Sequence, residues 1–333
     1  MGRHRQEHGR VLSPTLRVVK RFIWTRKVDR IVPMNFADQL FRRVLELRNP
    51  CLVGLDPHLS MMPKEFESLH GNTATRAEMA QDVVRFFSGV IDAVADLVPA
   101  VKPQSAFFEA LGVAGVEAWE EVVKLSHQAG LLVIGDVKRG DIGSTAAAYA
   151  QAFLTGMRGC DPETLCDCIT INPYLGSDSI EPFLKACKDS GKGLYVLVRT
   201  SNPGSAEFQL QGEPTLSELV ADAVVGWGKD LVGEGGYSSV GAVVGATHPT
   251  DLAALRKRMP GVPFLIPGYG AQGGGAQELT PAFGAHFAGG LVNSSRGILY
   301  PKAKPGQHWK DAVREATQTM IEEFRALDLN PVS

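Results

Sequence analysis

The chain has 333 residues, of which 44% are hydrophobic and 21% charged, and its formal net charge at neutral pH is −2. This is the composition of an ordinary globular protein, and no apolar run approaches the roughly 20 residues of a membrane-spanning helix. We therefore expect no association with a membrane.

Residues 1–33 are strongly basic, with nine Lys and Arg against two acids, whereas the rest of the chain carries a net charge of −9. A net-acidic body is unlike a nucleic-acid-binding domain. The basic segment lacks the apolar core of a secretory signal. Three interpretations of this segment remain open: a disordered tail, a targeting peptide, or sequence upstream of the true start. Because Met34 precedes a helical pattern, we expect residues 1–33 to be a disordered extension and residues 34–333 to form one folded domain.

From residue 34 onward, short apolar runs typical of strands alternate with longer stretches of helical spacing. The expected strands are 51–56, 100–104, 131–138, 168–173, 194–200, 240–247, 263–268 and 289–295. The expected helices between them are 76–97, 109–128, 144–157, 178–189, 214–232, 249–259, 274–284 and 306–326.

This alternation predicts parallel strands joined by right-handed helical crossovers. Eight strand–helix units over roughly 290 residues fit an α/β fold of the (β/α)8 (TIM) barrel type. A doubly wound open sheet is the alternative, but the glycine fingerprint of nucleotide-binding sheets is absent after the first strand. We therefore expect a single-domain barrel, with its active residues at the C-terminal ends of the strands.

The third expected strand ends in a cluster of charges. Asp136 and Lys138 are two positions apart, so their side chains point to the same face of the strand. A buried acid and base are costly unless each neutralises the other. Lys102 ends the second strand and needs an acid beside it, for which Asp136 is the best candidate. Asp141 follows three residues after Lys138, and it could instead cap the next helix.

Two loops favour the binding of a phosphate group. A glycine-rich stretch, 268–275, follows the seventh strand, and 293–297 follows the eighth. Barrels often bind phosphate with the backbone N–H groups of these two loops. Arg296 could add a bidentate contact and Gln272 a neutral donor. The alternative is a flexible turn with a surface arginine. Asp56 ends the first strand and could cap the following turn.

The five cysteines, Cys51, Cys160, Cys166, Cys168 and Cys187, form no recognisable zinc motif. An odd number without a secretory signal favours reduced thiols and a cytoplasmic protein. We interpret these cysteines as structural. We interpret His58 and His248, which lie near strand ends, in the same way. The polar side chains of the turn 199–204 could form hydrogen bonds with the edge of a nucleotide base, or they could only stabilise the turn itself.

These residues together carry a family resemblance. Asp136-x-Lys138-x-x-Asp141, combined with Lys102 and the two phosphate loops, resembles orotidine 5'-phosphate decarboxylase. The stretches 101–109, 172–178, 199–204 and 293–298 resemble its bacterial type 2 branch. The resemblance runs from about residue 35 to residue 326, in the motif order of the family, and it does not include residues 1–33.

The resemblance implies a reaction and its catalytic residues. The carboxylate on carbon 6 of orotidine 5'-phosphate would leave as carbon dioxide, giving uridine 5'-phosphate in the last step of UMP biosynthesis, without a metal or an organic cofactor. Lys138 would protonate the carbanion at carbon 6, Asp136 would lie by the leaving carboxylate, and Lys102 would bridge Asp136 and the ribose. Asp141 and Thr145 would enter the site of the partner subunit in a homodimer.

The resemblance also implies the substrate contacts. Asp56 would bind the ribose, Ser201 the pyrimidine, and Gln272 and Arg296 the phosphate. The segments 201–213 and 269–276 are candidates for a loop that closes over the phosphate. Two alternatives stay open: a magnesium-dependent sugar-phosphate aldolase or decarboxylase such as hexulose-phosphate synthase, which shares Asp-x-Lys-x-x-Asp, and a barrel that binds a phosphate ligand without catalysis.

Overall fold

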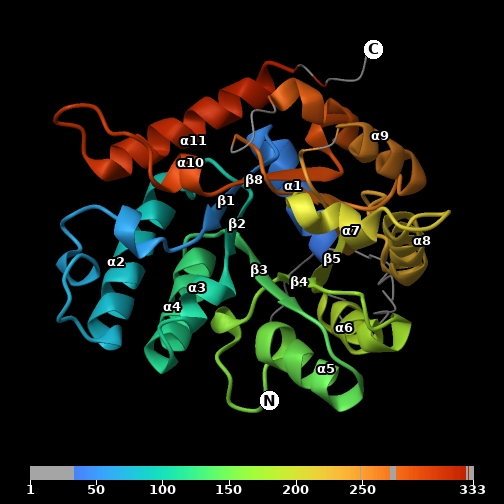
Figure 1. Cartoon of the computed structure of the whole chain (residues 1–333), viewed down its shortest axis with the longest axis horizontal. Helices are drawn as coiled ribbons and strands as arrows, with labels where there is room; N and C mark the ends of the chain where they lie inside the picture. The colour runs from blue at the N-terminus through green and yellow to red at the C-terminus, as the bar shows by residue number, and fades with distance from the viewer. Residues whose placement is uncertain (1–33, 248, 271–274, 328, 330–333) are drawn as a thin grey trace, which may run out of the picture. The chain divides into compact units, whose positions relative to one another are not determined.

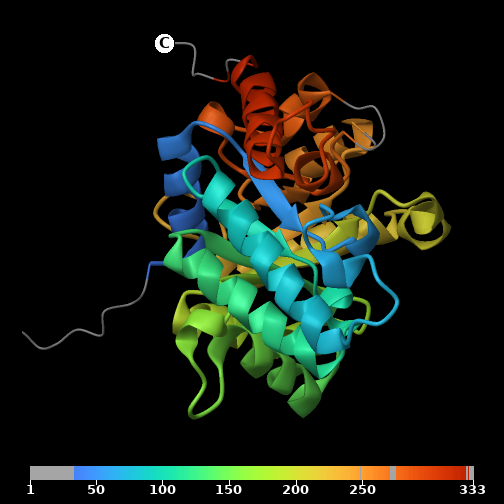
Figure 2. The ribbon, with the colours of Figure 1, turned by 90° about the vertical axis from the view of Figure 1, so that its left-hand side faces the viewer.

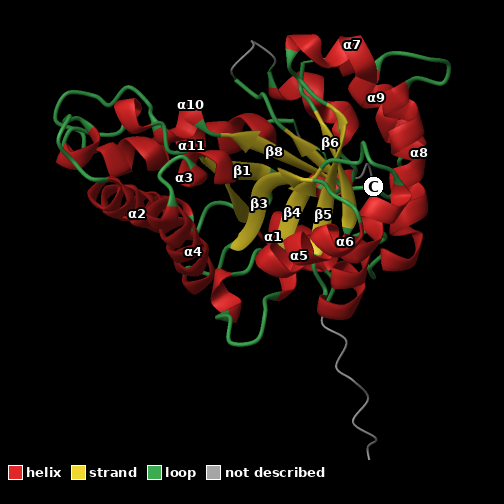
Figure 3. Cartoon of the chain, turned by 60° about the horizontal axis from the view of Figure 1, so that its bottom comes forward, coloured by secondary structure: helices red, strands yellow, loops and turns green. Residues whose placement is uncertain are grey.

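Eight parallel strands close into a barrel in the computed structural model of the chain, which describes residues 34–247, 249–270, 275–327 and 329. Each strand pairs with the next along the chain, and β8 pairs with β1. Figure 3 shows the strands inside and the helices outside. This arrangement confirms the predicted (β/α)8 barrel. The strands are β1 Cys51–Leu55, β2 Ala100–Pro103, β3 Leu132–Arg139, β4 Cys168–Ile171, β5 Gly193–Arg199, β6 Val240–Val244, β7 Phe264–Ile266 and β8 Gly290–Ser294.

The helices pack around this barrel (Figure 1). Neighbouring helices along the chain also pack against each other, as α2 and α4 do in Figure 2. The helices are α1 Phe36–Leu47, α2 Arg76–Val94, α3 Ser105–Glu109, α4 Val113–Gln128, α5 Gly143–Ala150, α6 Ser177–Ser190, α7 Ala206–Gln209, α8 Leu216–Gly228, α9 Pro249–Arg258, α10 Arg296–Leu299 and α11 Trp309–Arg325. Within the described residues, none of them is long and apolar enough to cross a membrane.

Local signals in the sequence account for where the longer helices begin. Helix α2 begins with a capping box, in which the Thr75 side chain accepts from the Glu78 backbone N–H and the Glu78 carboxylate accepts in return from the Thr75 N–H. Thr215 and Glu218 form the same motif at the start of α8. Each cap satisfies backbone donors that a helix start leaves without partners, so both helices begin within two residues of the positions expected from spacing.

The core lies between the outer faces of the strands and the inner faces of the helices. Every residue of β1, β2, β4, β6, β7 and β8 is buried, as expected for parallel strands covered on both faces. Large aromatic side chains such as Phe86, Phe87, Phe108 and Phe183 fill the space beneath the helices. This packed scaffold holds the C-terminal ends of the strands in fixed positions.

The predicted helix 274–284 is wrong. Its described part is a 3₁₀ segment, Ala276–Ala282, with Pro281 inside it. Proline removes a backbone donor and clashes with the preceding turn, which disfavours an α-helix at this position. The connection between β7 and β8 is therefore the one described crossover without an α-helix.

Candidate active site

Two lysines share one carboxylate at the mouth of the barrel. Lys102 Nζ lies 2.8 Å from Asp136 Oδ2, and Lys138 Nζ lies 2.5 Å from Asp136 Oδ1. The side chains of Lys102 and Asp136 are only 5% and 9% exposed, whereas that of Lys138 is 46% exposed. The predicted pairing of these three residues is thus present in the structure, with Lys138 as the member that can reach a ligand.

The charges of this cluster hold one another in their ionised forms. Burial alone would raise the pKa of Asp136, but Lys102 and Lys138 overcome it and hold the pKa well below its usual range. Burial likewise would lower the pKa of Lys102, but the charges of Asp136 and Asp56 outweigh it, so the pKa is raised. The site therefore presents a fixed ammonium group beside a carboxylate that stays ionised.

Two further side chains complete the coordination of Asp136. Gln104 donates to its Oδ2 at 2.9 Å, and Thr170 donates to its Oδ1 at 2.8 Å. Neither residue is among the contacts of Asp136 predicted from the sequence. The sequence does hold one indication for Thr170: apart from Cys168, the other residues of β4 are isoleucines, so Thr170 places a hydroxyl in a buried strand. Its side chain is 1% exposed.

Lys138 has an unusual backbone conformation. Its φ of 45° lies in the left-handed region, which costs a residue with a Cβ roughly 1–2 kcal/mol. The pairing of β3 with β4 shifts register between Gly135 and Arg139, so the segment that carries Lys138 bulges away from β4. Strain of this kind is often found at active sites.

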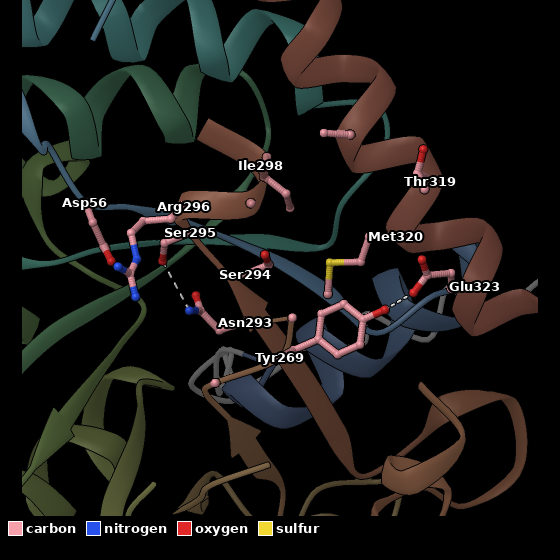
Figure 4. A pocket seen from close by; sticks show the side chains of 14 residues that line it. Asp56, Tyr269, Asn293, Ser294, Ser295, Arg296, Ile298, Thr319, Met320 and Glu323 are labelled. Carbon is pink, nitrogen blue, oxygen red and sulfur yellow. Dashed lines mark hydrogen bonds between the residues drawn. The ribbon is translucent and has the colours of Figure 1, made fainter. Parts of the chain in front are cut away.

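A pocket of about 680 Å³ opens at the C-terminal ends of β1 and β8. Asp56, whose charge acts on Lys102, belongs to its lining, whereas Lys102, Asp136 and Lys138 do not. Arg296 lies at one end of it with Asp56, and Tyr269 lies at the other, where its hydroxyl donates to the Glu323 carboxylate (Figure 4). Arg296 is exposed and makes no ion pair with any described residue. Its guanidinium group is therefore available to an anion. The remaining lining comes from the loop after β7, the end of β8, α10 and α11: Gly268, Gly270, Asn293, Ser294, Ser295, Gly297, Ile298, Ala316, Thr319 and Met320.

The pocket also presents unpaired hydrogen-bond acceptors. Asp56 Oδ1 and Asn293 Oδ1 are buried and, among the described residues, have no donor. The loop that carries Asp56 is fixed by Tyr300, whose hydroxyl donates to the Asp56 carbonyl oxygen at 2.8 Å and accepts from the His58 N–H at 2.9 Å. A ligand hydroxyl could satisfy either orphaned oxygen, because hydroxyls donate as well as accept.

Ser201 lies at the mouth, beside the ends of β6 and β7. A Cβ added to Gly245 would lie 2.8 Å from the Ser201 Cβ, and one added to Gly268 would lie 3.6 Å from its Oγ. The neighbouring Thr200 is occupied within the turn, where its hydroxyl donates to Asn202 at 2.6 Å. Of the two roles left open for 199–204, turn closure thus accounts for Thr200 and Asn202, whereas the Ser201 hydroxyl makes no hydrogen bond with any described residue.

Asp141 and Thr145 lie apart from the lysine pair. Asp141 Oδ1 accepts from the Ile142 N–H at 2.8 Å, and Thr145 is exposed on the first turn of α5. The alternative role of Asp141 as a helix cap is wrong, because the cap residue of α5 is Ile142. Gln272 and His248, predicted as a phosphate contact and a structural histidine, lie outside the described residues.

Four of the five cysteines have the surroundings of structural residues, whereas Cys160 is exposed. Cys51, Cys166, Cys168 and Cys187 are buried and unpaired, and burial raises the pKa of each, that of Cys166 to about 12. Thiols held in this protonated form are poor nucleophiles and poor metal ligands. In the part of the chain that the structure describes, no group of three or more His, Cys, Asp or Glu side chains could hold a metal ion.

Comparison with known proteins adds to this geometry. Residues 53–312 match the family described as "Orotidine 5'-phosphate decarboxylase / HUMPS family". The chain is 44% identical to a protein of Rhodopirellula baltica, over 88% of this chain and 99% of the relative, and 40% identical to one of Deinococcus radiodurans, over 87% and 97%. Both relatives bear the name orotidine 5'-phosphate decarboxylase.

A solved structure agrees with the sequence relatives. The OMP decarboxylase of Leishmania donovani is 32% identical to this chain and superimposes with a TM-score of 0.70. The alignment covers 89% of this chain and 99% of that one. The likeness therefore extends over almost the whole described barrel.

Proposed function

This chain belongs to the orotidine 5'-phosphate decarboxylase family, and from that premise we propose that it decarboxylates orotidine 5'-phosphate to uridine 5'-phosphate, with Lys138 as the proton donor. The observation that carries the mechanism is the buried Lys102–Asp136–Lys138 cluster, whose only half-exposed member is Lys138. A half-exposed lysine whose ammonium group is bonded to a fixed carboxylate is suited to protonate a carbanion.

In the proposed reaction, the bond between carbon 6 and the carboxylate breaks and its electron pair stays on carbon 6. The ammonium group of Lys138 stabilises this charge as it develops and then transfers a proton to carbon 6. The amine that remains takes a proton back from solvent, which reaches it because the Lys138 side chain is 46% exposed. Asp136, which is fixed by four donors, keeps the ammonium group in place before the reaction begins.

The pocket at Arg296 is the proposed phosphate site. Arg296 makes no ion pair with a described residue, and the adjacent glycines of the loop after β7 let backbone N–H groups approach an anion. Gln272, which lies outside the described residues, is proposed as a second phosphate contact by resemblance. Binding energy from the phosphate would position the small pyrimidine at Lys138.

The ribose and pyrimidine would occupy the space between these two regions. The buried Asp56 Oδ1 supports a bond from a ribose hydroxyl, and Lys102 lies close enough to Asp56 for the charge of Asp56 to raise the Lys102 pKa. Ser201, beside the ends of β6 and β7, is the proposed pyrimidine contact.

We also propose that two subunits complete each site. Among the described residues, Asp141 and Thr145 make no hydrogen bond or ion pair with the lysine pair, although they follow directly from β3. Two large apolar side chains are exposed on the loops after β3 and β4: Ile142 is 56% exposed and Tyr174 is 80% exposed. Such residues are suited to cover a partner copy, which would bring Asp141 to the opposite site.

A metal-free assay tests the proposed reaction. Purified chain is treated with a chelator, and the loss of orotidine 5'-phosphate is followed by absorbance in the continued presence of that chelator. We expect undiminished decarboxylation. Activity that depends on added magnesium would favour the sugar-phosphate aldolase and decarboxylase group, and binding of uridine 5'-phosphate without any turnover would favour a non-catalytic barrel.

A further inference from the structure

We infer that Thr170 is a positioning residue, which holds the Lys138 backbone and the Asp136 carboxylate in their reactive arrangement through one hydroxyl group. This inference rests on the proposed function for its meaning in catalysis, but its structural part stands on the bulge in β3. Thr170 lies in β4, between Ile169 and Ile171, and its side chain is buried.

The hydroxyl of Thr170 makes two hydrogen bonds whose directions are both determined. It accepts from the Lys138 backbone N–H at 3.0 Å and donates to Asp136 Oδ1 at 2.8 Å. A backbone N–H can only donate and an ionised carboxylate can only accept, so the hydroxyl proton has a single possible position. Thr170 thus joins the backbone of the proposed proton donor to the carboxylate that holds its ammonium group.

The strand pairing explains why this bond is needed. Strand β3 pairs with β4 at Gly135 with Ile169, and again at Arg139 with Ile171. Three residues of β3 therefore stand opposite the single residue Thr170, and the ladder leaves the Lys138 N–H without a backbone partner. The Thr170 hydroxyl replaces that missing carbonyl. It stabilises the bulge in which Lys138 adopts its left-handed φ of 45°.

Each of the two carboxylate oxygens of Asp136 accepts from two donors. Oδ1 accepts from both Thr170 and Lys138, while Oδ2 accepts from Lys102 and Gln104. Loss of the hydroxyl would leave the part-buried Lys138 N–H without this partner and would remove one of the two donors that hold Oδ1. The ammonium group of Lys138 would then lose its fixed position, although the phosphate and ribose contacts would be untouched.

Variants at Thr170 separate this role from simple packing. Thr170→Val has nearly the same shape without a hydroxyl, and Thr170→Ser keeps the hydroxyl. We expect kcat for orotidine 5'-phosphate to fall on the order of 10²-fold in Thr170→Val, with KM changed by less than about threefold, and Thr170→Ser to recover most of the loss. Thr317→Val is a matched control, because Thr317 is fully buried and its hydroxyl bonds only within α11, to the Val313 carbonyl.

A second measurement does not depend on catalysis. Hydrogen–deuterium exchange resolved to single residues should show a protected Lys138 amide in the native chain and in Thr170→Ser, and faster exchange in Thr170→Val. If Thr170→Val does not fold, Thr170→Ala takes its place with the same expectation. Unchanged Lys138 exchange without the hydroxyl, an equal loss of kcat in Thr170→Ser, or a loss confined to KM would each overturn the inference. Absence of decarboxylation by the native chain would instead contradict the proposed function, and the exchange experiment would still decide the role of Thr170.

Discussion

Lys138 Nζ lies 2.5 Å from Asp136 Oδ1, although the strand that carries both residues is interrupted by a bulge between them. In a regular strand, residues two apart share a face but diverge along the chain direction. Lys138 itself has a left-handed φ of 45°. The pair is therefore held within a strained segment of backbone, whose second support is the bond from the Lys138 N–H to Thr170.

Replacement of Lys138 tests this pair. Lys138→Ala removes the only half-exposed ammonium group of the cluster and leaves the Arg296 pocket intact. We expect kcat to fall by at least 10³-fold, within the range lost with a general acid, while affinity for uridine 5'-phosphate stays within about threefold of the native value. Turnover and calorimetric titration of the product measure the two quantities.

A second lysine provides the control for this prediction. Lys185→Ala removes a surface lysine on α6 that pairs with Asp189, four residues on, and it should leave both quantities unchanged. Near-normal decarboxylation by Lys138→Ala would remove Lys138 from the mechanism and leave another group to protonate carbon 6.

Arg296→Ala is predicted to act on binding. A charge-assisted contact with an anion contributes roughly 1.5–3 kcal/mol, so affinity for uridine 5'-phosphate should fall about tenfold to a hundredfold. Affinity for uridine, which lacks the phosphate, should not change. Arg258→Ala is the matched control, because Arg258 pairs with Asp222 and Glu218 away from the pocket. An equal loss for both ligands would place the phosphate elsewhere.

The barrel and its charge cluster could be predicted from sequence because both follow from local rules. Alternation of apolar strands with helices fixes parallel pairing, and a lysine and an acid at the ends of buried strands must find each other. Lys102, Asp136 and Lys138 are therefore joined as expected. The assignment of the chain to the type 2 branch, and the roles of individual residues, stay predictions.

The parts that sequence could not predict depend on how strands meet. Thr170 acts where three residues of β3 oppose one of β4, and no pattern within either strand shows that bulge. Gln104 contacts Asp136 because it continues β2 by one residue, as an isolated bridge to Asp136. The 3₁₀ segment also differs from the expected helix 274–284, and Pro281 alone does not predict it, because α6 contains Pro182 and is helical throughout.

Mixed subunits test the proposed sharing of sites. Lys138→Ala and Asp141→Ala chains should each be nearly inactive alone. In a mixed dimer, one site receives native Lys138 from one chain and native Asp141 from the other, and the second site lacks both. Random mixing makes half of the dimers mixed, so about a quarter of native activity should return. Tags of different size confirm the exchange of subunits, and no recovery with mixed dimers present would place Asp141 outside the partner's site.

We predict that His127 stabilises the fold in a pH-dependent way at the end of the barrel opposite the site. His127, at the end of α4, has its Nε2 3.0 Å from Asp167 Oδ2 and its Nδ1 2.8 Å from the Glu163 carbonyl oxygen. Asp167 Oδ2 also accepts from the Val133 N–H at 2.8 Å, which ties α4 to the beginning of β3. Burial and the nearby Lys192 lower the pKa of His127, but Asp167 and the Glu163 carbonyl outweigh them, so the pKa is raised above 6.5.

A raised pKa means that the folded protein binds a proton more tightly than the unfolded chain does. The contribution of His127 to stability is therefore fully present below about pH 6.5 and is lost as pH rises through the folded pKa. Asp167 has a lowered pKa, so its own contribution is lost only in acid, below its ordinary value of 3.8, and does not vary between pH 6 and 9. We expect the difference in unfolding free energy between the native chain and His127→Gln to be largest near pH 6 and to shrink steadily toward pH 9. Urea unfolding at several pH values measures this difference, and a difference that stays constant with pH would show that His127 binds Asp167 in its neutral form.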